Sequence, residues 1–504
     1  MALTYASPGV YVEEVDRGTK PIEAVGTSLA AFIGVTAEAS IKVLDPATGK
    51  KVPKEKVLNK PTLVTSWTQF TDIFGDFIAG AYLPDAVYGY FANGGGPCYV
   101  TSLRALREEG GVKYAGVVVP GKTRGTSFKV SAKVPGSAGN KLAVTVKAEE
   151  GETFSLTVGS EVKAGLTLKT LAEAAFEAVT VSDIGTVFPA DGTYTLTGGE
   201  MAPLSAADFI GDAGARTGLG GLEALEDVRL VLIPDLVAGY DGSEDAKARI
   251  KAVQTAMIAH CERMRYRFAI LDTPPGLSAQ QAKEWRNYVN FDTSYAAMYY
   301  PWIQVVDLSG GGSTKKLVPP SGYIVGIYNR VDAERGVHKA PANEVILGAI
   351  DLELILSKGE QDVLNPIGVN CLRSFPGRGI RVWGARTLSS NGAWRYISVR
   401  RLFIMVEASM DVGLAWVVFE PNDATLWAKV IRDVSSFLRV VWRGGALFGA
   451  TPEQAFYVKC DAELNPLEIR DLGQLIIEVG LAPVKPAEFV IFRISQWAGA
   501  NAEA

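Results

Sequence analysis

Three aspartates in the middle of the chain have the residue type and spacing that a catalytic site could use. Asp235, Asp272 and Asp307 each follow a run of apolar, β-prone residues. Open α/β sheets bind ligands beyond the carboxyl ends of their strands, so three carboxylates there could hold a metal ion and a phosphate. The same position suits an aspartate that caps a helix or closes a turn. We favour the second interpretation, because position in a fold does not establish chemistry.

The two histidines are weaker candidates. His260, Cys261 and Glu262 are consecutive, so on a helix they point in different directions and cannot hold one ion together. His338 has no serine or cysteine nucleophile motif to complete a catalytic pair. We interpret His260 as part of a helix end packed on a strand, and His338 as structural or as part of a contact between subunits.

Glycine-rich segments also suggest binding sites. Residues 94–96 and 310–312 lack the Lys and Ser/Thr of a phosphate-binding loop, so turns or a flexible loop are the better interpretation. Elsewhere four arginines stand among glycines, where they would bind an anion or pair with another subunit. These are Arg373, Arg378, Arg381 and Arg386. We favour pairing.

Composition limits the partners. The 504 residues carry a formal net charge of -5, with 48% hydrophobic and 21% charged residues, so the chain lacks the clustered positive charge that nucleic acid requires. No uninterrupted apolar stretch is long enough for a membrane span, and the first residues do not resemble a signal peptide, so we expect a cytoplasmic protein. The four cysteines are widely spaced, which indicates buried free thiols. They are Cys98, Cys261, Cys371 and Cys460.

Strand and helix patterns alternate in the segments that would position these residues. Residues 222–308 read as strand, helix, strand, helix, strand, which predicts parallel βαβ units. Residues 25–104 show a similar pattern. Residues 105–200 instead hold short alternating runs rich in Gly, Thr, Ser, Val and Lys, which predict a small β-rich insertion with one helix at residues 166–179.

The predicted fold class is α/β in a multidomain α+β arrangement. A core built from N- and C-terminal segments would carry an α/β middle domain, a β-rich insertion and extended terminal strand arms. The predicted boundaries are an N-terminal arm at 1–24, an N-terminal core segment at 25–104, the insertion at 105–200, the middle domain at 201–344, a C-terminal core segment at 345–483 and a C-terminal arm at 484–504.

One helix is especially well marked. Apolar residues recur at helical spacing over residues 426–442, with Asn422 or Asp423 available as a cap and Gly444 as a stop. Four cations lie on the other side, as a solvated face or as a contact with a partner. They are Lys429, Arg432, Arg439 and Arg443.

Both ends of the chain read as lone strands. The C-terminal one begins apolar on both faces, and neither has a neighbouring strand to pair with, so we expect each to add to the sheet of another subunit. The arm residues are Val10, Tyr11 and Val12 at one end, and Phe489, Val490, Ile491, Phe492 and Ile494 at the other. Such a head-to-tail contact generates an open helix unless its rotation closes into a ring.

Several long segments resemble, in the same order along the chain, the tail sheath proteins of contractile phage tails and related injection systems. The main run holds VPPSGYIVGIYNRVDAERGVHKAPANE, LNPIGVNCLRSFPGRGIRVWGARTLSS and WRYISVRRL within residues 318–402. Further runs are SPGVYVEEV, FANGGGPCYV, VVFEPND, GATPEQAFYVKCD and APVKPAEFVIFRISQW. The resemblance covers both ends and most of the middle of the chain.

This resemblance implies a structural subunit that catalyses no reaction and holds no cofactor or metal. It implies six-fold rings stacked helically around an inner tube, which contract when a baseplate releases them and drive the tube through a target membrane. Baseplate and terminal cap proteins would be partners, assembly would be cytoplasmic, and the protein would neither bind nucleic acid nor insert directly into a membrane. The insertion would lie on the outer surface. The alternatives are a metal-dependent α/β hydrolase at the three aspartates and a static filament or shell protein.

Overall fold

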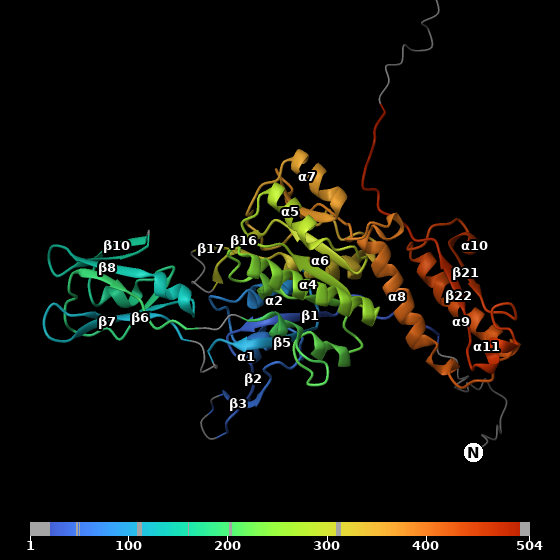
Figure 1. Cartoon of the computed structure of the whole chain (residues 1–504), viewed down its shortest axis with the longest axis horizontal. Coiled ribbons are helices and arrows are strands. Elements are labelled where there is room, and N and C mark those ends of the chain that lie inside the picture. The colour runs from blue at the N-terminus through green and yellow to red at the C-terminus, as the bar shows by residue number, and fades with distance from the viewer. Residues whose placement is uncertain are drawn as a thin grey trace, which may run out of the picture. The chain divides into compact units, whose positions relative to one another are not determined.

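The computed structural model describes residues 21–46, 49, 51–107, 113–159, 161–200, 204–308 and 314–493. The chain forms two compact units. The larger, here called the α/β unit, comprises residues 26–405 and 484–504, and the small unit comprises residues 1–25 and 406–483. Figure 1 shows the mixed helices and strands of both units, in agreement with the predicted α/β multidomain class.

An eight-stranded sheet organises the α/β unit, in the order β20-β19-β15-β14-β13-β1-β5-β4. Its six inner strands are parallel, and the edge strands β4 and β20 are antiparallel to their neighbours. The strands are β1 (Ala30–Thr36), β4 (Thr62–Val64), β5 (Cys98–Ala105), β13 (Leu230–Leu232), β14 (Phe268–Asp272), β15 (Ala296–Tyr300), β19 (Val369–Phe375) and β20 (Gly379–Val382). The parallel pairing predicted for residues 222–308 is confirmed.

Helices bury both faces of this sheet. Phe32 of β1 packs with residues of α2 and α6, whereas Ile33 packs on the opposite face with residues of α4 and α5. Strands covered on both faces read as continuous apolar runs, as the fully buried β1 does. The helices of this unit are α1 (Trp67–Phe74), α2 (Leu83–Ala92), α3 (Ala206–Ile210), α4 (Glu244–Met264), α5 (Ala279–Val289), α6 (Ser321–Arg335) and α7 (Lys358–Leu364).

The sheet differs from the domain boundaries predicted from sequence. It combines strands from residues 25–104 and 345–483, which were predicted as two parts of one core, with strands from residues 201–344, which were predicted as a middle domain. The small unit begins only at residue 406 of the C-terminal half. The run at residues 295–307 also differs from the single strand predicted for it. The chain turns after Tyr300, and β16 (Ile303–Val306) joins β17 (Lys315–Val318) and β18 (Asp351–Leu352) in a second sheet.

The insertion has its own apolar core between two small antiparallel sheets. The strands are β6 (Gly116–Pro120), β7 (Thr126–Ala132), β8 (Ala143–Ala148), β9 (Phe154–Val158), β10 (Glu161–Leu166), β11 (Val179–Ser182) and β12 (Gly192–Thr195). The helix predicted at residues 166–179 is wrong, because only a 3-10 turn forms there, at Thr170–Glu173. Both ends of that segment lie in strands β10 and β11, so tertiary pairing overrides its helical propensity. A separate exposed hairpin joins β2 (Ser40–Leu44) to β3 (Lys51–Lys56).

The small unit is built around one long amphipathic helix. α8 (Ile397–Gly413) enters it from the α/β unit, and α9 (Ala424–Arg443) follows. β21 (Phe456–Lys459) and β22 (Glu478–Leu481) form a two-stranded antiparallel sheet against α9, with the short helix α10 (Pro452–Ala455) beside them. The short helix α11 (Leu467–Asp471) lies in the segment that joins the two strands.

Candidate assembly interface

Asp235 occupies the position at which an open α/β sheet would bind a ligand. It follows β13 in a 3-10 turn, and its carboxylate accepts hydrogen bonds from the backbone N–H of Val35 at 2.7 Å, Tyr82 at 2.5 Å and Leu83 at 3.2 Å. Tyr82 and Leu83 open helix α2, so the carboxylate caps that helix against β1. Burial raises the pKa of Asp235 to about 7 despite these hydrogen bonds.

Asp272 caps the N-terminus of helix α6 in the same way. Its carboxylate accepts a hydrogen bond at 3.0 Å from the backbone N–H of Ser321, where α6 begins, and burial raises its pKa to about 7. Asp307 instead lies 3.4 Å from the ammonium of Lys316, which also pairs with Asp85 at 2.8 Å.

These contacts do not favour the metal-site hypothesis for the three aspartates. Two of the carboxylates are committed to helix N-termini and the third to an ion pair. The portion of the chain that the structure describes holds no group of three or more His, Cys, Asp or Glu residues arranged to hold a metal ion. It also contains no helix long and apolar enough to cross a membrane.

The two histidines and the four cysteines, which were the other candidates from the sequence, are buried or partly buried. His260 is buried beside the guanidinium of Arg267, and burial followed by that positive charge lowers the His260 pKa to about 3. His338 is partly buried, and burial likewise lowers its pKa. Cys98, Cys261, Cys371 and Cys460 are free and buried, as predicted.

The arginine cluster separates into two kinds of contact. Arg386 forms an ion pair with Glu488 near the C-terminal end, so its pairing lies within one chain. Arg373, Arg378 and Arg381 bond to amide or carbonyl oxygens instead, and Phe375 packs against the guanidinium groups of the first two. Among the described residues these three arginines have no carboxylate partner, and their pairing with another subunit stays a prediction.

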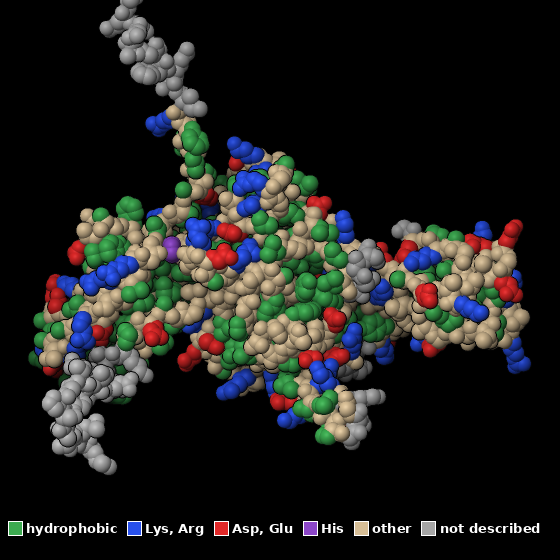
Figure 2. Space-filling view, turned by 180° about the vertical axis from the view of Figure 1, so that it is seen from behind, with side chains coloured by type: hydrophobic (Ala, Val, Ile, Leu, Met, Phe, Trp, Pro, Cys, Tyr) green, Lys and Arg blue, Asp and Glu red, His purple; other side chains and the backbone are tan. Residues whose placement is uncertain are grey.

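The C-terminal arm leaves the α/β unit at Glu488. Phe489, Val490, Ile491 and Phe492 are 71%, 70%, 79% and 83% exposed, which is unusual for four consecutive apolar side chains. Figure 2 shows hydrophobic side chains along this segment. Residues 484–493 form no strand within this chain. Ile494, Val10, Tyr11 and Val12, the other predicted arm residues, lie outside the described residues.

The root of the N-terminal arm, residues 21–25, packs on α8 in the small unit. Ile22 is 7% exposed and lies so close to Gly413 that a β-carbon there would stand 2.7 Å from its side chain. The backbone N–H of Val25 donates a hydrogen bond to the hydroxyl of Ser409 at 3.0 Å. The residue at position 413 is therefore restricted to glycine by the arm that crosses it.

Helix α9 has the predicted amphipathic form. Asp423 caps it by accepting a hydrogen bond from the backbone N–H of Leu426 at 2.9 Å. Its buried side is the apolar stripe Leu426, Trp427, Val430, Val434, Phe437, Leu438 and Val441. The four predicted cations, Lys429, Arg432, Arg439 and Arg443, lie outside this stripe. Arg432 also pairs with the neighbouring Asp433 at 2.9 Å, so its charge is partly compensated.

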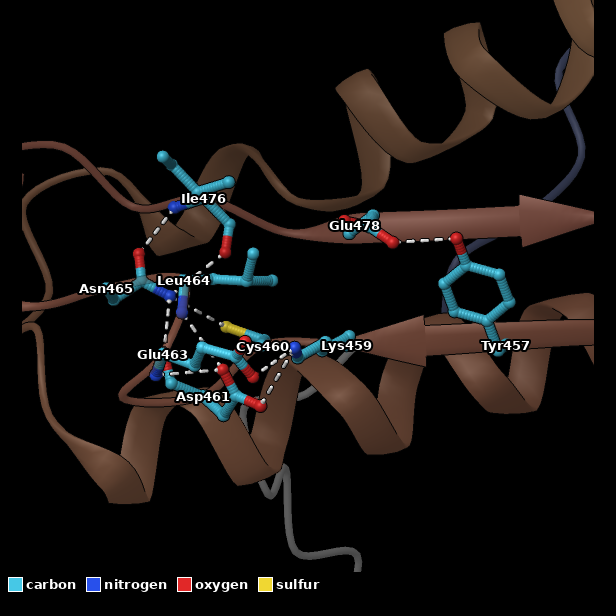
Figure 3. Close-up of polar contacts among 9 residues, drawn as sticks. All are labelled: Tyr457, Lys459, Cys460, Asp461, Glu463, Leu464, Asn465, Ile476 and Glu478. Atoms are coloured by element: carbon cyan, nitrogen blue, oxygen red, sulfur yellow. Dashed lines mark hydrogen bonds and ion pairs between the residues drawn. The ribbon is translucent and has the colours of Figure 1, made fainter.

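The β21–β22 sheet is held together at one end by a buried asparagine (Figure 3). The amide of Asn465 donates to the carbonyl oxygens of Asp461 and Ile476, and its oxygen accepts from the backbone N–H of Ile476 at 2.7 Å. Tyr457 and Glu478 are hydrogen-bonded across the strands at 2.7 Å. In the described chain no third strand joins this sheet, and Leu447 forms an isolated bridge with Pro483 just after β22.

Sequence reasoning missed three of these features. The pairing of Arg386 with Glu488 spans 102 positions, and no local pattern marks it. The one available signal was an isolated carboxylate at the start of an apolar run, AEFVIF. Asn465 and Ile22 likewise act through contacts that only the folded chain brings together.

Comparisons with known proteins place the chain among sheath proteins. Residues 214–388 match the phage tail sheath protein central domain, and residues 389–496 match the phage tail sheath C-terminal domain. A prophage major tail sheath protein of Pseudomonas aeruginosa (strain UCBPP-PA14) is 28% identical over 309 residues, which cover 59% of this chain and 75% of that protein. The tail sheath protein of Burkholderia phage BcepMu is 27% identical over 311 residues, which cover 56% of this chain and 60% of that protein.

Solved structures share the fold along nearly the whole chain. The PVC sheath complex of an extracellular contractile injection system, in its contracted state, is similar with a TM-score of 0.60, 24% identity and 99% coverage of both chains. The helical sheath of the anti-feeding prophage in its contracted state gives a TM-score of 0.60 and 24% identity, covering 98% of this chain and 100% of that one.

Proposed function

Since the chain belongs to the contractile tail sheath family and is a structural subunit of a contractile sheath, we propose that its copies stack in six-fold rings arranged helically around an inner tube. Contraction of the stack then drives the tube through a target membrane. The partners are other copies of this chain, the inner tube protein, and baseplate and terminal cap proteins. The subunit does not bind nucleic acid or insert directly into a membrane, and the sheath assembles in the cytoplasm.

The exposed apolar run Phe489–Phe492 is the observation that carries this proposal. Four adjacent side chains that are 70% exposed or more leave apolar surface in water that a second copy would cover. The β21–β22 sheet is the acceptor we propose. A two-stranded sheet is marginal alone, and a strand added from another copy supplies both backbone hydrogen bonds and apolar cover. The N-terminal arm, residues 1–24, contributes a second strand in the same manner.

Helix α9 is the surface we propose for the inner tube. Lys429, Arg432, Arg439 and Arg443 recur at helical spacing away from the buried stripe, so they present one cationic face. Exposed ion pairs contribute only about 0–1 kcal/mol each, but every subunit of every ring repeats them. The tube surface that meets this helix is therefore expected to be acidic.

The test removes the apolar arm while retaining Glu488. A chain that ends at Glu488 is expected to fold as a soluble subunit and to form no tubes, as judged by sedimentation and electron microscopy. A Val490→Ser, Phe492→Ser variant is expected to reduce tube yield at least tenfold. The matched control is Val118→Ser, Val162→Ser, which changes two exposed valines of the insertion. Tubes of normal length from the truncated chain would contradict the proposal.

A further inference from the structure

We propose that Glu488 and Arg386 form an ionic clasp that fixes the point at which the C-terminal arm leaves the α/β unit. Glu488 is then a positioning residue for the arm. This inference rests on the proposed function, in which the arm links one copy to the next, and it adds the element that determines where the link begins.

The carboxylate of Glu488 accepts hydrogen bonds from three residues on both of its oxygens. Oε1 accepts hydrogen bonds from Nε of Arg386 at 2.8 Å and Nδ2 of Asn365 at 2.7 Å. Oε2 accepts from Nη2 of Arg386 at 2.7 Å and the hydroxyl of Tyr396 at 3.1 Å. The guanidinium thus engages both oxygens, which is the strongest and most directional form of a carboxylate pair. Two neutral donors, one on each oxygen, complete the set.

The clasp is attached to the centre of the sheet. The backbone N–H of Arg386 donates to Oδ1 of Asn370 at 2.7 Å, and the amide of Asn370 donates to the carbonyl oxygens of Arg386 at 2.8 Å and Met298 at 3.2 Å. Asn370 is fully buried in β19, and Met298 lies in the adjacent strand β15. A pull on the arm is therefore passed through Arg386 to two paired strands of the eight-stranded sheet.

Exposure changes abruptly at the clasp. The Glu488 side chain is 18% exposed, whereas each of the next four residues is at least 70% exposed. Residues 484–490 border a groove of about 860 Å³ that Phe375 and Trp383 also line. Without the clasp, residues 484–488 would join the free tether and lengthen it by roughly 17 Å, at 3.3–3.6 Å per residue. A longer tether lowers the effective concentration of the arm at its acceptor.

The charge on Glu488 persists at neutral pH. Partial burial alone would raise the pKa of this carboxyl, but the hydrogen bonds from Arg386, Asn365 and Tyr396 together lower it below its usual value. The ion pair is mostly shielded from solvent, so salt screens it less than it screens a surface pair.

A reporter beside the clasp measures its hold on the arm. In the full chain, Ala487→Cys introduces one thiol on the arm while the four native cysteines are buried, so a nitroxide reagent labels position 487 selectively. In unassembled subunits separated by size exclusion, the label is expected to be immobile in the otherwise unchanged chain. Adding Glu488→Ala is expected to make it mobile, with Glu488→Gln intermediate. Arg386→Lys, which keeps the charge but loses the two-pronged contact, is also expected to be intermediate.

The matched control is Glu344→Gln. Glu344 pairs with Lys339 at 2.7 Å in the same unit, with similar partial exposure, and Glu344 is not among the residues that line the groove beside residues 484–488. This change should leave the nitroxide at position 487 immobile. Equal mobility of the nitroxide in the Glu488→Ala chain and in the unchanged chain would contradict the proposed clasp.

Measurements of tube yield distinguish a failure of the clasp from a failure of the proposed function on which it rests. Tube yield from Glu488→Ala is expected to fall at least threefold, with a melting temperature close to that of Glu344→Gln. A mobile label together with an unchanged tube yield would overturn the positioning role. Tubes from the chain that ends at Glu488 would instead overturn the proposed role of the arm, whatever the label shows.

Discussion

The two arms of this subunit have roots held by different interactions. The C-terminal root depends on one carboxylate, Glu488, with four hydrogen bonds from three separate segments. The N-terminal root depends on the burial of Ile22 against Gly413 and on one hydrogen bond from Val25 to Ser409. The ion pair of Glu488 fixes the point at which the C-terminal arm leaves its unit while burying little apolar surface. The packing of Ile22 instead attaches the N-terminal arm to the core of the small unit. The two roots should therefore fail under different changes.

Truncating Ile22 should have the largest effect on stability. Ile22→Ala truncates a buried side chain that lies against Gly413 of α8, and such changes cost about 2–5 kcal/mol. Chemical denaturation followed by tryptophan fluorescence checks the loss, because α9 carries Trp427 and Trp442. Ile355→Ala, at a 67% exposed isoleucine, is the control and should change stability little. Equal stability of the two variants would mean that the N-terminal root does not belong to the core.

The pH dependence of stability should distinguish the clasp from the buried aspartates. The pKa of Asp272 is raised from 3.8 to about 7 in the folded chain. Between these values the folded state holds a proton that the unfolded state releases, so this contribution is full below pH 4 and is lost as pH rises through 7. Asp272→Asn should therefore make the stability slope over pH 5–7 less negative, by up to about 1.4 kcal/mol per pH unit.

The contribution of Glu488 to the pH dependence of stability has the opposite sign. Its pKa is lowered below the usual 4.5, so its contribution is present above that value and is lost only as pH falls through the lower, folded pKa. Glu488→Gln should therefore leave the slope over pH 5–7 unchanged. Urea denaturation of both variants at several pH values checks the pair of predictions. A steeper slope for Asp272→Asn, or a changed slope for Glu488→Gln, would contradict the assignments.

The smallest effect per residue is expected on helix α9. Replacing Lys429, Arg432 and Arg439 with Gln removes charges worth about 0–1 kcal/mol each and leaves the buried stripe intact. Subunit stability should hardly change, yet tube-filled extended particles should become fewer and empty contracted sheaths should accumulate. Counting both forms in electron micrographs at ordinary salt checks this. The wild-type proportion of filled particles would show that this face is only solvated.

Local patterns predicted the elements better than their assembly. The apolar run at Ala30–Thr36 and the stripe of Ala424–Arg443 are visible in the sequence because burial on both faces, or on one helical side, leaves a periodic signature. The joining of β1 and β5 with β13 and β19 in one sheet is set by long-range pairing, which no short window contains. The residues of the candidate interface show the same difference between local sequence features and long-range contacts. The apolar arm and the cations of α9 were named from the sequence and their roles stay predictions, whereas the partner of Glu488 was not predicted.

A density map of assembled tubes would show directly which sheet the C-terminal arm joins. We expect Phe489–Phe492 to form a strand on the β21–β22 sheet of another copy, Glu488 to stay paired with Arg386 of its own chain, and the insertion to lie on the outer surface. The same strand link should be present in extended and contracted tubes. A map in which Phe489–Phe492 packs against its own subunit, or remains unpaired in both states, would contradict the proposed strand link between copies.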